Sequence, residues 1–179
     1  KGDAFNRLRL RLTDQQNFQA DNLKDNVHKL ISLFKEENIK GALEFGTSLL
    51  SQYPDHLIIL NVLGASSFRS KNYKSSLHFY RKAITIKPDY ADSYNNLGNV
   101  YLEFGRMEET VSYLKKALMI KRIYPQARKS LANAYRLNNK ILSDRTVLLE
   151  ALTFSPGNYE IYRELGRLML KEKIPSSAF

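Results

Sequence analysis

Residue types that support catalysis or metal binding are scattered along this sequence of 179 residues. The histidines His28, His56 and His78 lie far apart, so no two of them are one helical turn from each other as paired metal ligands would be. The adjacent carboxylates Glu36–Glu37 and Glu108–Glu109 fall in stretches typical of solvated turns, with no pocket implied for acid–base work. There is no cysteine, Gly-rich phosphate loop or nucleophile motif. We therefore predict that this chain is not an enzyme and that it holds no cofactor and no metal.

Polar side chains with amide or basic groups recur at a fixed spacing instead. Two sets of polar residues share that spacing: Asn95, Lys129 and Arg163, and Asn99, Asn133 and Arg167. An asparagine amide offers both a donor and an acceptor, which suits an extended peptide whose backbone amides need partners whatever its sequence. Lysine and arginine bind carboxylates, arginine in bidentate fashion. Whether these side chains share one surface depends on the elements that carry them.

The apolar and turn-forming positions follow the same 34-residue period. The residues that repeat with it are Leu63, Leu97, Leu131 and Leu165, then Ala83, Ala117 and Ala151, then Pro54, Pro88 and Pro156. Arg122 stands where the missing proline of the last series would fall. Between Ala91 and Tyr124, apolar residues form two helical stripes joined at Gly105. One short hairpin cannot bury both of its stripes, so the sequence predicts an all-α array of stacked copies.

Each unit resembles the tetratricopeptide repeat. Tyr94, Leu97, Gly98 and Tyr101 match the aromatic, Leu-Gly and tyrosine positions of its signature, and the neighbouring units match most of it. The resemblance implies an all-α, right-handed superhelical solenoid of antiparallel helix hairpins that binds other proteins. We expect a basic N-terminal tail or linker at residues 1–22 and an array over residues 23–179. Its units are 23–56, 57–90, 91–124, 125–158 and the incomplete 159–179.

The resemblance also implies that the first helix of each unit lines a concave groove. The predicted peptide-binding residues on this surface are Asn61, Asn95, Asn96, Asn99, Lys129, Asn133, Arg163 and Arg167. The surface changes from apolar near Ile58, through an asparagine-lined middle, to basic at its far end. A partner segment that carries acidic groups would suit that basic end. An alternative interpretation is that these residues are polar because the face is wet and unoccupied.

Two subtypes of the family have recognisable groove patterns, and this sequence departs from both. Lys129 and Asn133 fit part of the pattern of the subtype that holds a terminal carboxylate of chaperone tails. Glu164 stands where the next asparagine should be, and its charge would repel that ligand. The asparagine ladder of the sugar-transferase subtype is represented by Asn96 alone. Neither subtype is therefore supported by the sequence.

The net charge of +10 predicts attraction to acidic partners. The basic residues are spread over every repeat, as in a solvated helical surface. Nucleic-acid binding is disfavoured because the aromatic positions serve the core and recurrent base-reading side chains are lacking. No apolar run approaches the ~18 residues that cross a bilayer, so we expect no membrane association. The absence of cysteine is compatible with a reducing compartment, and we expect a cytoplasmic location.

Two functional hypotheses follow from these observations. We favour a protein–protein interaction scaffold that binds a peptide segment of a partner in the concave groove. The alternative is a substrate-recruiting arm of a larger group-transfer enzyme, similar to glycosyl- or sulfotransferases, with its catalytic domain beyond Phe179. The uncovered last unit would also permit self-association. Within the fourth unit, Ser143 or Asp144 is expected to cap a late-starting helix, since burying an unpaired carboxylate costs several kcal/mol.

Overall fold

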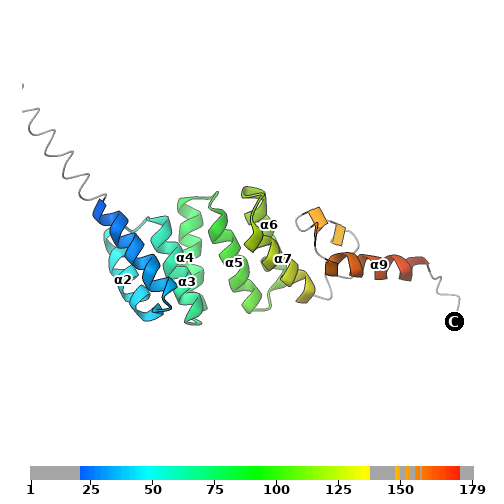
Figure 1. Ribbon diagram of the computed structural model, residues 1–179, viewed down its shortest axis with the longest axis horizontal. Helices are drawn as coiled ribbons and strands as arrows, with labels where there is room; N and C mark the ends of the chain where they lie inside the picture. The colour runs from blue at the N-terminus through cyan, green and yellow to red at the C-terminus, as the bar shows by residue number, and fades with distance from the viewer. Residues whose placement is uncertain (1–20, 138–147, 150–151, 154–155, 158, 174–179) are drawn as a thin grey trace, which may run out of the picture. The chain divides into compact units, whose positions relative to one another are not determined.

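The computed structural model describes residues 21–137, 148–149, 152–153, 156–157 and 159–173 (Figure 1). Residues 21–35 form a helix. The helices that follow are α2 (Ile39–Gln52), α3 (Leu57–Arg69), α4 (Tyr73–Ile86), α5 (Ala91–Glu103), α6 (Met107–Ile120), α7 (Pro125–Leu137) and α9 (Tyr159–Lys173). No strand occurs in these described ranges. Most of the predicted tail lies outside the described residues, as do Ser143 and Asp144.

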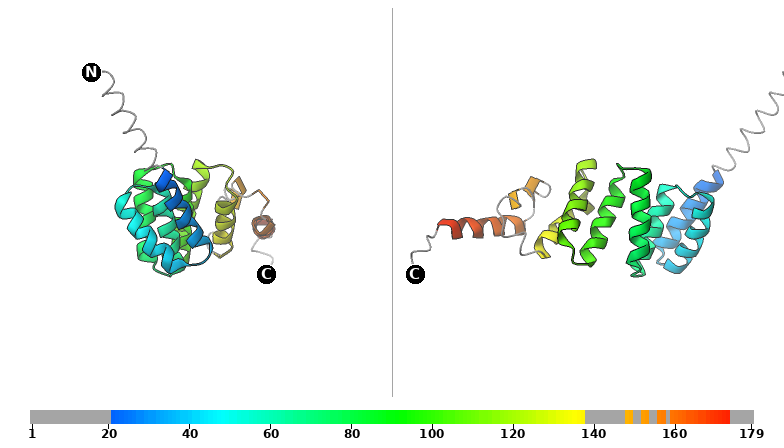
Figure 2. Two further views of the ribbon diagram at one scale, coloured as in Figure 1. Left: turned by 60° about the vertical axis from the view of Figure 1, so that its left-hand side comes forward. Right: turned by 180° about the vertical axis from the view of Figure 1, so that it is seen from behind.

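The helices repeat with the period seen in the sequence. The helices α3, α5, α7 and α9 begin at evenly spaced positions, Leu57, Ala91, Pro125 and Tyr159, and the starts of α2, α4 and α6 have the same spacing. Consecutive helices form antiparallel hairpins, as Figure 2 shows for α5 and α6. The chain divides into two compact units, Lys1–Phe79 and Tyr80–Phe179, which we call the N-terminal and C-terminal units. The predicted all-α fold with a 34-residue period is therefore confirmed.

The core of the N-terminal unit lies between the helix over residues 21–35, α2 and α3. Leu30, Ile59 and Leu63 are fully buried there. Gly46 of α2 faces this cluster, and a Cβ at that position would lie 2.8 Å from Cδ2 of Leu63. The absence of a side chain at Gly46 therefore allows α2 and α3 to approach closely.

The core of the C-terminal unit joins α5, α6 and α7. Leu97, Leu114 and Leu131 are fully buried in it. Gly98 allows α5 and α6 to approach closely, since an added Cβ would lie 2.7 Å from Cγ of Leu114. The leucine at the equivalent place of the last unit, Leu165, is partly buried against the same cluster. The leucines that recur once per repeat are thus core residues.

The turns inside the hairpins repeat their backbone conformation more faithfully than their residue type. Glu37, Lys71 and Gly105 occupy equivalent places in successive units, and all three adopt a positive φ, of 61°, 59° and 67°. The residue after the first two is an asparagine that caps the next helix: Oδ1 of Asn38 accepts from the Gly41 amide, and Oδ1 of Asn72 from the Ser75 amide. Glycine adopts the left-handed conformation without a steric penalty, whereas glutamate and lysine do not.

Replacing Lys71 by glycine is therefore expected to raise the free energy of unfolding by about 0.5–1 kcal/mol. Removing Cβ relieves the strain of the left-handed conformation, which is about 1–2 kcal/mol. This gain is larger than the free-energy cost of the greater backbone entropy that glycine has in the unfolded chain. Urea denaturation followed by far-UV circular dichroism measures the change. Lys71→Ala keeps Cβ and should give no gain, and Gly105→Ala should cost about 1 kcal/mol. Equal stabilisation by the glycine and alanine variants would show that the lysine side chain, not the backbone, was responsible.

Candidate functional site

The first helices of successive hairpins lie side by side in the C-terminal unit. α7 packs against α5 and against α9 (Figure 1). Residues one repeat apart occupy equivalent positions on these helices, so the two polar sets predicted from the sequence face the same way. The structure places the members of these sets on adjacent helices: Asn95, Lys129 and Arg163, and Asn99, Asn133 and Arg167. The predicted member Asn61 lies on α3 of the N-terminal unit, where it is half-buried.

Asn95 differs from the expectation that it projects into a groove. Its side chain lies one turn after Ala91, on the helical face that joins the core, and the residue is only 5% exposed. Its Nδ2 donates to Oδ1 of Asn96 over 3.3 Å. Among the described residues, Oδ1 of Asn95 has no hydrogen-bond partner. Asn95 is therefore closed to a ligand in this conformation and holds the amide of its half-buried neighbour Asn96.

The middle of the candidate surface is more accessible. Asn99 of α5 and Asn133 of α7 are half-buried, and Lys129 of α7 is exposed. Two amides and one ammonium group therefore lie on adjacent helices at the solvent boundary. This arrangement can donate to and accept from a polypeptide backbone and attract one acidic group.

The basic end of the candidate surface is partly neutralised. Arg163 and Arg167 of α9 are both exposed. Nε of Arg167 donates to Oε1 of Glu164 over 2.7 Å, and the two side chains form an ion pair. The charge of Glu164, which we expected to repel an acidic ligand, is thus offset by Arg167 of its own helix. The peptide-binding role of these residues stays a prediction.

Three tyrosines fix the position of α5 against α6. The rings of Tyr101 and Tyr113 stack at 5.2 Å with an interplanar angle of 7°, and Tyr94 packs at 6.3 Å from Tyr113. Nη2 of Arg81 donates to the Tyr101 hydroxyl over 2.6 Å, and the guanidinium of Arg106 lies over the Tyr101 ring. Burial, and then the neighbouring Tyr101, raises the pKa of Tyr113. These contacts hold the hairpin that carries Asn99.

The sequence reasoning missed one electrostatic feature. Between residues 110 and 143 there are eight Lys and Arg residues and no Asp or Glu, so this stretch carries +8 of the net +10. The basic residues are indeed spread along the chain, but the acidic ones are absent from one repeat length. Counting acidic residues per repeat would have revealed it. The first turn of α6 holds two glutamates that balance its two lysines, so the excess positive charge begins in the C-terminal half of α6 and continues through α7.

Two further properties concern the parts of the chain that the structure describes. Within them, no group of three or more His, Asp or Glu side chains is placed to hold a metal ion. None of the helices described is long and apolar enough to span a membrane.

Two family models match the chain. The model described as TPR repeat matches residues 66–105, and the model described as Tetratricopeptide repeat matches residues 91–124. No curated protein sequence matches the chain.

Similar solved structures share the fold. An O-GlcNAc transferase from Thermobaculum terrenum is 23% identical with a TM-score of 0.65; 74% of this chain aligns with it but spans only 26% of that protein. YrrB, a TPR protein with an unusual peptide-binding site, is 14% identical with a TM-score of 0.63, covering 84% of this chain and 78% of that one. The first TPR domain of Spaghetti (RPAP3), bound to the HSP90 peptide SRMEEVD, is 16% identical with a TM-score of 0.60, covering 64% and 91%. At these identities the likeness shows the fold.

Proposed function

The chain belongs to the tetratricopeptide-repeat family, and from this we propose that it is a protein-interaction scaffold that holds an extended segment of a partner protein. Solenoid repeats of this kind build extended surfaces from equivalent positions of successive units. The segment lies across α5, α7 and α9. Asn99 and Asn133 contact its backbone, and Lys129 and Arg163 attract its acidic groups.

The observation that carries this proposal is the direct packing of α7 against both α5 and α9, with amides at equivalent places of α5 and α7 and an arginine at that place of α9. Packed helices lie about 8–10 Å apart. An extended peptide advances about 3.3 Å per residue, so neighbouring helices would contact backbone groups about three residues apart. The amides of Asn99 and Asn133 satisfy donors and acceptors of a backbone that leaves water.

Two similar structures support a peptide as the bound species. The Spaghetti (RPAP3) domain is bound to a peptide whose sequence, SRMEEVD, contains three acidic residues. YrrB has a peptide-binding site that its description calls unusual. A partner segment with acidic residues also fits the positive charge around α7 of this chain.

The test uses peptides selected against the chain from a random library. The double variant Asn99→Ala with Asn133→Ala is expected to bind the selected peptides about 2 kcal/mol more weakly, because two hydrogen bonds to the peptide backbone are lost. This corresponds to a roughly thirtyfold rise in Kd. Isothermal titration calorimetry measures the affinity. The control replaces two asparagines outside this surface, Asn22→Ala with Asn26→Ala, and should leave binding unchanged.

Hydrogen exchange of the complex locates the bound peptide independently. Protection is expected on α5, α7 and α9. Unaltered affinity in the Asn99 and Asn133 double variant, together with protection confined to other helices, would rule out the proposed surface.

A second candidate role is the substrate-recruiting arm of a group-transfer enzyme. It is raised by the likeness of this chain to 26% of the O-GlcNAc transferase. The asparagine ladder expected of such an arm is represented by Asn96, while Val62, Ser130 and Glu164 occupy its other places. The coding sequence after Phe179 decides the matter: a catalytic domain there supports this role, and a stop codon removes it.

A further inference from the structure

The second helix of the third hairpin, α6, presents a second surface that does not include the candidate groove. Met119 is 70% exposed on it. Lys116 lies one turn before Met119 on the same face of the helix, and Arg122 follows just beyond the helix end; both are exposed. Methionine is a flexible, polarisable apolar side chain that is common at adaptable binding surfaces.

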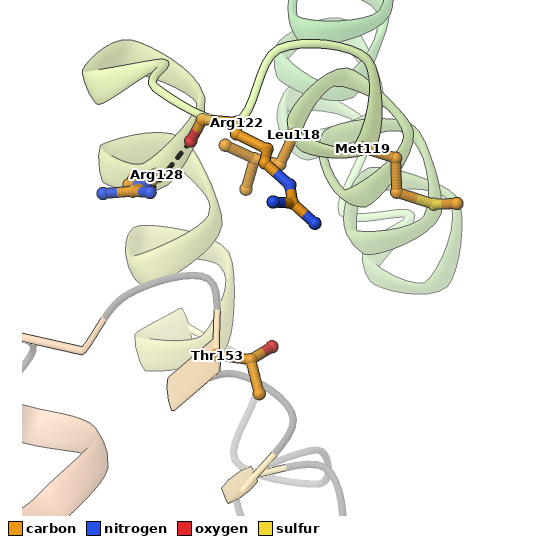
Figure 3. A pocket seen from close by; sticks show the side chains of 5 residues that line it. All are labelled: Leu118, Met119, Arg122, Arg128 and Thr153. Atoms are coloured by element: carbon orange, nitrogen blue, oxygen red, sulfur yellow. Dashed lines mark hydrogen bonds between the residues drawn. The ribbon is translucent and has the colours of Figure 1, made fainter.

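One hollow lies at the C-terminal end of α6. It has a volume of about 490 Å³ and is lined by Leu118, Met119, Arg122, Arg128 and Thr153. Figure 3 shows the guanidinium of Arg122 directed into the open space between α6 and Thr153. Nη2 of Arg128 donates to the backbone carbonyl of Arg122 over 2.8 Å. This contact fixes the turn in which Arg122 replaces the proline of the other units.

A second hollow lies earlier on the same helix. It has a volume of about 460 Å³ and is lined by Tyr94, Ser112, Tyr113, Lys115, Lys116 and Met119. Met119 lines both hollows. The two hollows thus share one lining side chain, and we call the surface of α6 from Lys116 through Met119 to Arg122 the strip. It has lysines toward one end, the apolar Met119 at its centre and arginines at the other end.

The cations of this strip have few acidic neighbours. Among the residues that the structure describes, neither Lys116 nor Arg122 forms an ion pair. The nearest carboxylate toward the amino terminus of α6, Glu109, is paired with Arg106. Lys121 lies 4.6 Å from the ring of Tyr124. Asp92, whose side chain is hydrogen-bonded to Tyr124, is a carboxylate close to this end of the helix. Since no acidic residue occurs between residues 110 and 143, the basic residues of the strip still outnumber their acidic neighbours, and its potential is positive.

We propose that this strip on α6 is a second protein-binding site, which takes an acidic peptide segment with an apolar residue between its carboxylates. The carboxylates pair with Lys116 and Arg122, and the apolar residue packs on Met119 between the two hollows. Four residues at the helical rise separate Lys116 from the helix end at Ile120, and two more residues lead to Arg122, so the two backbones are on the order of 10 Å apart. An extended peptide spans that distance in about three residues, so acidic residues about three positions apart fit the strip.

The chemistry of the strip favours a peptide over a nucleic acid. Single-stranded nucleic acids need accessible aromatic rings on which their bases stack. The two rings at this site, Tyr94 and Tyr113, are half-buried, and one face of Tyr113 is already covered by Tyr101. What remains accessible is the thioether of Met119 and the aliphatic stems of Lys116 and Arg122, which bind apolar side chains.

Fluorescence anisotropy with labelled probes tests the site in the full 179-residue chain. The probe is a peptide of about 12 residues with glutamates about three positions apart and leucines between them. Lys116→Gln with Arg122→Gln is expected to weaken its binding about tenfold, and Met119→Ala several-fold. Lys74→Gln with Lys87→Gln removes two exposed charges elsewhere and should change the affinity less than about twofold. The peptide with glutamine in place of glutamate should not bind measurably.

Each other outcome overturns the proposal. If the acidic peptide fails to bind, there is no site for it on α6. If Lys116→Gln with Arg122→Gln and Lys74→Gln with Lys87→Gln reduce the affinity equally, the binding is not specific to α6. Tighter binding of a single-stranded RNA of the same length, lost in the same variants, assigns the strip to nucleic acid instead. If Asn99→Ala with Asn133→Ala abolishes peptide binding and the α6 variants do not reduce it, the peptide lies in the groove. That outcome supports the proposed function and rejects the second site.

Discussion

Replacing Leu114 by alanine is expected to lower the free energy of unfolding by about 3 kcal/mol. Leu114 is fully buried where α6 meets α5, and its Cγ is the atom against which Gly98 packs. Removing three carbon atoms there forfeits their burial and leaves a cavity that two close-packed helices cannot fill by a small shift. The urea midpoint should fall at an unchanged slope, as followed by far-UV circular dichroism.

The matched control for this prediction is Leu170→Ala on α9. Leu170 has the same side chain on a helix but is mostly exposed. Its loss should cost less than about 0.5 kcal/mol. Comparable destabilisation by the two variants would contradict the placement of Leu114 in the core.

Replacing Gly98 by valine is expected to cost about 3 kcal/mol for the opposite reason, which is overpacking. A Cβ at this position would lie 2.7 Å from Cγ and 2.9 Å from Cδ2 of Leu114, and 3.3 Å from the carbonyl oxygen of Thr110. The carbonyl cannot swing away, so α5 and α6 must separate. Gly166 occupies the equivalent position two units later, and among the described residues a Cβ there would meet no atom of another element within 4 Å. Gly166→Val should therefore change the stability by less than about 0.5 kcal/mol.

The two changes should be strongly coupled, because each acts on the same volume. In the double variant, the cavity left by Leu114→Ala makes room for the valine side chain introduced at Gly98. The double variant should therefore be destabilised by about 2 kcal/mol less than the sum of the two single variants. Additive losses in the four-member cycle would show that Gly98 does not pack on Leu114. The cycle thus tests the geometry of the hairpin as well as its stability.

The fold was predictable because a 34-residue period is a constraint on every unit at once. Leu63, Leu97 and Leu131 were expected in the core from spacing alone, and all three are fully buried. The helix starts at Ala91 and Pro125 also follow from that spacing. A position that is ambiguous in one unit is clear in another when the pattern repeats. The helices in the structure therefore lie close to where the repeat period predicts them.

The candidate site was less predictable, since it depends on how deep each side chain lies. Asn95 was expected to face a ligand because of its place in the first helix of its unit, which the family resemblance assigns to a groove, yet it is buried on the face that carries Ala91. The spacing of Glu164 and Arg167 allows an ion pair, but whether the pair forms depends on the conformations of the two side chains. Helical position determines which way a residue points but not how closely its neighbours cover it.

The strip on α6 was missed for another reason. The basic residues are distributed along the chain, so their positions alone do not indicate a charged patch. A surface potential depends on the sum of both signs, so the absence of acidic residues between positions 110 and 143 is as informative as the presence of basic ones. Met119 does not belong to the apolar stripe of α6 and lies on the exposed face, where the helical pattern predicts no contact for it.

The stacked tyrosines give the C-terminal unit a spectroscopic signature of its own. The chain has no tryptophan, and nine of its eleven tyrosines lie from Tyr80 onward, so its near-ultraviolet dichroism and intrinsic emission come mainly from that unit. Helical backbone in both units contributes to the peptide absorption bands. A thermal unfolding curve recorded from the tyrosine signal therefore reports mainly on the C-terminal unit. A difference between its midpoint and that of the far-ultraviolet curve would show that the two units unfold separately.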